Sequence, residues 1–200
     1  MASSISPSAS GPFASAPARP GRAVTATAVL TILACVGFAL VNVVFELTDR
    51  FSGGAYADYA DGLAVMNWLV VGLKIVGAGV ALLSVAPERR WAPAPLVAVL
   101  AWAGFATLGV YGLGSVVQAL GLATGMTGDP GRIGAGAVAY VLFFLLFAVG
   151  FGTLAVSHTR RHRIRARVAV VGFLGAPLLL GGVFVGIPAL LAALGVMPPL

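Results

Sequence analysis

Five long apolar stretches divide this chain, and they constrain its fold more than any other feature. They span residues 23–45, 63–85, 95–120, 134–156 and 168–194. Each is at least as long as the roughly 20 residues that a helix needs to cross about 30 Å of hydrocarbon. Lipid offers no water to the backbone, so segments that cross it must be helical. The sequence therefore predicts an all-α fold, a polytopic membrane helix bundle with five transmembrane helices.

The composition leaves no room for a soluble domain. Charged residues make up 9% of the chain and its mean hydropathy is +1.03, whereas about 25% of residues are charged in soluble domains. Residues 1–22 are rich in Ser, Ala and Pro with almost no large apolar side chains, so we expect a disordered tail. Residues 195–200 form a short terminus. The predicted transmembrane domain covers residues 23–194.

The arginines predict the orientation of the bundle. Nine of them lie in the tail, in the second loop or in the fourth loop, and only Arg50 and Arg132 lie in the other two loops. Positive charge favours the cytoplasmic side of a membrane. We therefore expect a cytoplasmic N-terminus and an external C-terminus. Arginine outnumbers lysine 11 to 1, and Ala, Gly, Val and Pro dominate, which suggests a high-GC bacterial genome and hence a bacterial plasma membrane.

Lys74 is the residue in the spans that most needs an explanation. It lies eleven residues from each end of the 63–85 stretch, about 16 Å from either boundary at 1.5 Å per residue. A charge at that depth costs roughly 2.5–3.5 kcal/mol on insertion scales. Lys74 should therefore face protein or a water-filled cavity.

Polar faces on the first three spans suggest what Lys74 could meet. We predict an outward-facing polar pocket in which Lys74, Tyr111, the two asparagines and Glu46 form a ladder. Its candidate residues are Lys74, Asn42, Glu46, Asn67, Tyr111, Ser115 and Gln118. The alternative is that Lys74 bonds a tyrosine and backbone carbonyls and only holds the bundle together.

Two further features of the spans bear on packing. Phenylalanines crowd the fourth span and cover most of its circumference, so we expect at least part of that helix to carry them toward lipid. The fifth span contains Pro177 and Pro188, each of which favours a kink. The phenylalanines are Phe143, Phe144, Phe147 and Phe151.

The residues that enzymes and metal sites need are missing from the spans. Both histidines, His158 and His162, fall in the predicted fourth loop, and all six acidic residues lie at or beyond the span ends. The single cysteine, Cys35, excludes an internal disulfide. The HxxxH spacing lacks the third ligand that zinc requires. We predict no enzymatic activity, no cofactor and no metal site.

The fourth loop, residues 158–167, concentrates five arginines and both histidines. Such a segment attracts anionic lipid head groups at about 1 kcal/mol per charge. The role of this loop in setting the orientation of the bundle explains its positive charge, so we predict no nucleic-acid partner.

The sequences KIVGAGVALLSV, ERRW and LAWAGFATLGVYGLGS span the second and third predicted helices and the turn between them. In hydropathy, loop lengths and residue usage the chain resembles uncharacterised small multi-pass integral membrane proteins of high-GC bacteria. That resemblance implies a membrane helix bundle and supplies no catalytic residues.

Two functions fit these observations. The first is a structural or regulatory membrane subunit that packs against another membrane protein, as glycine-rich faces and absent chemistry suggest. The second is a small-solute or ion transport protein that uses the pocket around Lys74, although no internal repeat supports it.

Overall fold

The computed structural model describes residues 19–50, 52–53, 57, 60–86, 92–126, 128 and 134–182, and the regular structure in these ranges is helical. The helices are α1 (Arg22–Leu47), α2 (Ala60–Val85), α3 (Ala94–Ala123), α4 (Ala135–Arg161) and α5 (Ala166–Gly181). The predicted all-α bundle is confirmed.

Four of the helices, α1 to α4, are long and apolar enough to cross a membrane. The protein is therefore membrane-embedded. The described part of α5 has 16 residues, and the remainder of the predicted fifth span, with Pro188, lies outside the described residues. Residues 1–18 of the predicted tail and the predicted C-terminus at 195–200 also lie outside the described residues, and Arg22, the last residue of the predicted tail, begins α1.

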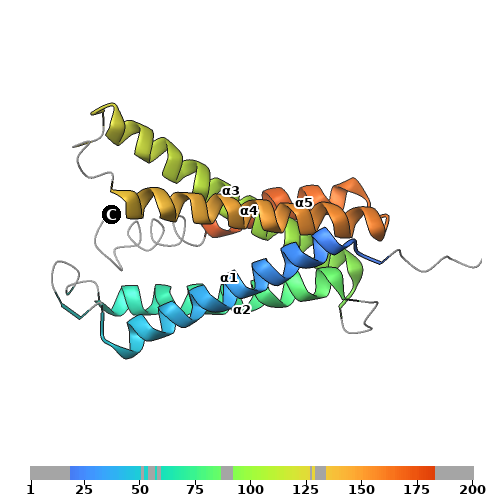
Figure 1. Ribbon diagram of the computed structural model, residues 1–200, viewed down its shortest axis with the longest axis horizontal. Coiled ribbons are helices and arrows are strands. Elements are labelled where there is room, and N and C mark those ends of the chain that lie inside the picture. Colours follow the sequence, from blue (N-terminus) through green and yellow to red (C-terminus); the bar gives the residue numbers. More distant parts are fainter. Residues whose placement is uncertain are drawn as a thin grey trace, which may run out of the picture.

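The helices form two groups (Figure 1). α1 and α2 lie side by side as an antiparallel pair, and α3 contacts both α4 and α5. Contacts of α4 with α1 and α2, and of α3 with α2, join the groups. Successive helices run in opposite directions, so α1, α3 and α5 begin at the end where α2 and α4 finish.

We call this end the arginine end, and it lies at the right of Figure 1. Its described arginines on or next to the helices are Arg22, Arg160, Arg161, Arg163, Arg165 and Arg167. The opposite end of the bundle contains Glu46, Asp49 and Arg50, and we call it the Glu46 end.

α4 continues five residues past the predicted span and finishes at Arg161. Arg163 then adopts a left-handed conformation with φ 48°, and the Ile164 N–H donates to the Thr159 carbonyl at 3.0 Å. This bond is the 6→1 link of a Schellman motif, which satisfies a carbonyl of the last turn. The motif turns the chain sharply into α5 and keeps the arginines at one end.

Small residues let the helices approach closely in the core. Phe151 of α4 lies against Gly77 of α2 and Gly104 of α3, where an added Cβ would stand 3.2 and 2.9 Å from its ring. Gly77 also faces the Cys35 sulfur of α1. Inside lipid, where no hydrophobic effect drives helices together, such close packing is the main source of cohesion.

The phenylalanines of α4 differ from the expectation that this helix carries them toward lipid. Phe144, Phe147 and Phe151 are at most 6% exposed. Their spacing of three and four residues places them on one face of a helix. That face packs against α1, α2 and α3, because small residues on those helices leave room for the rings.

Candidate functional site

Lys74 lies in a cage of three phenylalanine rings at the middle of the bundle. Its Nζ atom is 4.9 Å from the ring centre of Phe38 on α1, 5.2 Å from that of Phe144 and 4.4 Å from that of Phe147, both on α4. The residue is 9% exposed. Three helices therefore meet around one ammonium group, and we call this arrangement the Lys74 cage.

The cage offers the ammonium π faces in place of hydrogen-bond acceptors. A cation over an aromatic ring gains about 0.5–1 kcal/mol at exposed sites and about 2 or more when desolvated. That gain is comparable with the roughly 2.5–3.5 kcal/mol that a lysine at mid-depth costs on insertion scales. The rings thus offset much of the cost of placing Lys74 here.

The polar residues nearer the Glu46 end form a separate cluster between α1 and α2. The Asn67 side chain donates to the Asn42 carbonyl at 2.8 Å and to Glu46 Oε2 at 3.1 Å. The Asn42 amide in turn donates to the Phe38 carbonyl at 2.7 Å. The structure therefore brings these three candidate residues together. Asn67 lies on the same side of α2 as Lys74, seven residues before it.

The candidate residues on the third span do not meet Lys74. The Tyr111 hydroxyl pairs with the Tyr140 hydroxyl at 3.0 Å, and the rings of Tyr111 and Phe144 stand 4.8 Å apart. Phe144 therefore lies next to both Lys74 and Tyr111. Ser115 donates to the Tyr111 carbonyl within its own helix, and Gln118 is exposed.

A second polar cluster, at the arginine end, was not predicted. His158 is 3% exposed. Its Nδ1 lies 3.3 Å from the Ser84 carbonyl near the end of α2, and its Nε2 lies 3.1 Å from the Ala94 carbonyl at the start of α3. A neutral imidazole donates through one nitrogen only, whereas an imidazolium donates through both. His158 thus connects three helices, and we call this arrangement the His158 clamp.

Arg161, one turn further along α4, strengthens the clamp. Its Nη2 donates to the same Ser84 carbonyl, while its Nε is buried without a hydrogen-bond partner among the described residues. The last carbonyls of a helix lack intrahelical partners and carry partial negative charge. The end of α2 is therefore capped by side chains of α4. Close by, the Trp102 indole of α3 donates to Thr159 Oγ1 at 3.1 Å.

The spacing of buried residues on α4 contained a signal for the clamp. Phe144, Phe147, Phe151 and Leu154 follow one another at intervals of three and four, and His158 continues the series. Continuation of that series past the apolar stretch places His158 on the buried face. The charge of the surrounding segment concealed this, because a run of arginines is typical of a loop.

No group of three or more His, Cys, Asp or Glu side chains gathers in the part of the chain that the structure describes. The rings of the two histidines lie next to each other, tilted by 35° with their centres 4.3 Å apart. His158 has both nitrogens directed at carbonyl oxygens, so its lone pair is not presented to a metal.

Comparison with known proteins provides no family to which the chain can be assigned: no protein-family model, curated protein or solved structure matches it.

Proposed function

We propose that this protein is a structural or regulatory subunit of the bacterial plasma membrane and not an enzyme. The observation that carries the proposal is the Lys74 cage. The one charge at mid-depth is enclosed by phenyl rings of α1 and α4, which suits a helix junction better than a binding site. Two other buried polar residues, His158 and Asn67, also connect helices.

We also propose an orientation for the bundle in the membrane. The arginine end faces the cytoplasm and the Glu46 end faces outward, because positive residues favour the cytoplasmic side. The chain then begins inside and its C-terminus lies outside. A cysteine at Arg165 should be protected from an impermeant thiol reagent in intact cells, and a cysteine at Ser52 should be labelled.

An uncovered face of α2 supports a partner in the membrane. Gly72 and Gly79 lie two turns apart, and a Cβ added to either would meet no atom within 4 Å. Close helix packing in lipid uses small residues. We propose that another membrane protein packs on this face of α2.

Leucine substitutions test this interface. Gly72→Leu with Gly79→Leu should leave the isolated bundle folded, because both positions are open, but should release the partner. The measurement is the size of the complex that a mild detergent extracts from native membranes, on a native gel. Gly114→Leu on α3, also open, is the matched control. An unchanged size for the double variant, or equal release by the control, contradicts the proposal.

The Asn67–Glu46 pair favours a second candidate, transport of a small solute or ion through an outward-facing pocket at Lys74. Hydrogen-bonding groups extend from the Glu46 end toward the cage along one side of α2. The two candidates differ in what they require of residue 74. Lys74→Met should abolish transport in a flux assay if Lys74 lines a pathway, and should leave the native complex intact if Lys74 only joins helices.

A further inference from the structure

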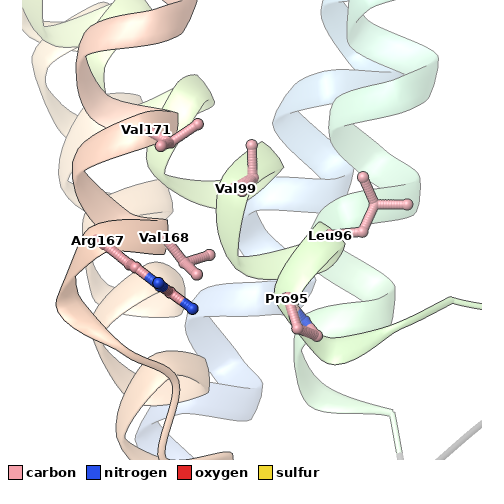
Figure 2. A pocket seen from close by; sticks show the side chains of 6 residues that line it. All are labelled: Pro95, Leu96, Val99, Arg167, Val168 and Val171. Atoms are coloured by element: carbon pink, nitrogen blue, oxygen red, sulfur yellow. The ribbon is translucent and has the colours of Figure 1, made fainter.

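An open groove runs between α3 and α5 at the arginine end (Figure 2). It has a volume of about 310 Å³ and is lined by Pro95, Leu96, Val99, Arg167, Val168 and Val171. Five of the six lining residues are apolar. The sixth, Arg167, lies at the rim near the start of α5, on the same side of the groove as Val168.

The packing of α3 on α5 creates this groove. A Cβ added to Gly172 would overlap the Val99 carbonyl oxygen and would stand 2.9 Å from the Trp102 Cβ. The two backbones therefore touch at Gly172. Val99 and Val171 line the groove beside this contact, and Pro95 and Arg167 lie at the mouth.

The mouth of the groove is electropositive, because two helices begin there and no acidic side chain offsets their partial charge in the described part of the arginine end. Pro95 belongs to the first turn of α3 and Arg167 to the first turn of α5, and neither helix has an acidic residue in that turn or a side-chain cap at its start. Helix N-termini carry partial positive charge and attract anions such as phosphate. Among the described side chains of the arginine end, none is acidic.

These features define the ligand chemically. It must place an apolar chain between two helices of a membrane-embedded bundle, and a negative head group where the helices begin. We infer that the groove binds an anionic phospholipid of the surrounding bilayer. Its acyl chain lies along Leu96, Val99 and Val171, and its phosphate faces Arg167.

This site is more specific than attraction of a basic loop to an anionic surface. A diffuse attraction treats all arginines of the loop alike, whereas the groove selects Arg167. Arg165 provides the matched control. It is the N-cap of α5, it is exposed, and it makes no side-chain capping bond.

Native mass spectrometry of the full chain in a nonionic detergent tests the inference, with phosphatidylglycerol or phosphatidylcholine added. One phosphatidylglycerol should bind about fivefold more tightly than phosphatidylcholine, as expected from roughly 1 kcal/mol per arginine near lipid head groups. Arg167→Gln should remove that preference, and Arg165→Gln should weaken binding by less than about twofold.

A second variant tests the apolar part of the groove. Val171→Phe places a larger apolar side chain in the groove without changing its charge, and should weaken binding of both lipids. Leu178→Phe, on the exposed surface of α5, should not weaken binding. Equal affinity for the two lipids, equal losses for the two arginine variants, or a dimer mass in place of a lipid adduct would overturn the inference.

Discussion

Lys74 and His158 are both nitrogen bases buried between helices, but their surroundings differ. Lys74 lies among phenyl rings, which stabilise a cation without fixing the direction of its N–H bonds. His158 lies between two backbone carbonyls, which fix its ring in one orientation. At the end of α2 the Ser84 carbonyl lacks an intrahelical partner and is free to pair with His158, whereas a base at mid-helix must rely on side chains.

Replacement of His158 should have the largest effect on stability. His158→Ala removes the side-chain partner of the Ala94 carbonyl, leaves Arg161 as the side-chain donor to the Ser84 carbonyl, and opens a void. We expect a loss of about 3 kcal/mol, typical of a buried hydrogen-bonding group removed together with its packing. The measurement is reversible unfolding in mixed detergent micelles.

Two controls accompany the His158 variant. Arg163→Ala, on the exposed turn that follows α4, should change stability by less than about 0.5 kcal/mol, as surface substitutions usually do. His158→Gln retains a donor and should fall between the two. If His158→Ala were as stable as the unmodified protein, the clamp would not hold the helices.

Asn67→Leu should have a smaller effect. It removes two bonds to α1, and interhelical hydrogen bonds in membranes contribute about 0.6 kcal/mol each. We expect a loss of about 1 kcal/mol by the same unfolding assay. A double-mutant cycle with Glu46→Ala, which removes the accepting oxygen, isolates the side-chain pair, and zero coupling would show that the Asn67–Glu46 contact adds nothing.

Lys74→Met should differ in sign from the His158 and Asn67 variants, because removal of this buried polar group should not destabilise the protein. Methionine packs well against aromatic rings, and the insertion cost of the charge disappears together with the cation–π gain. We expect a change within about 1 kcal/mol, in the stabilising direction. A loss as large as that of His158→Ala would mean that Lys74 has polar partners that the cage does not supply.

Tyr111→Phe should have the smallest effect. The hydrogen bond to Tyr140 joins two exposed residues, so the variant should lose less than about 0.5 kcal/mol. Tyr140→Phe should behave in the same way. A larger loss for Tyr111 alone would extend the polar network toward Lys74, as the sequence had suggested.

The sequence predicts the helices well because lipid imposes one solution on an apolar stretch of this length. α2 finishes at Val85, where its apolar stretch does, and α3 begins at Ala94, one residue before the predicted start. α4 extends past its apolar stretch because its polar last turn is satisfied by other helices at the arginine end. A hydropathy pattern cannot show this.

The candidate site was harder to predict than the fold. Helical periodicity places Lys74, Asn67 and Asn42 toward the interior, because polar side chains mark the face of each helix that turns away from lipid. It does not show which neighbour comes closest. We expected α3 and its Tyr111 next to Lys74, whereas α4 and its phenylalanines surround it, because Gly77, Gly104 and Gly150 let α4 pack deeply.

Thiol accessibility at position 74 reports whether water reaches the Lys74 cage. Cys35 is the single cysteine, so Cys35→Ala with Lys74→Cys provides one reporter at mid-depth, and Ser52→Cys in the same background provides a reporter at the Glu46 end. Intact cells are treated with a membrane-impermeant maleimide. If Lys74 only joins helices, residue 52 reacts and residue 74 stays protected among the phenyl rings. Reaction at residue 74 at a rate similar to that at residue 52 would show that water reaches the cage, and would contradict a purely structural role for Lys74.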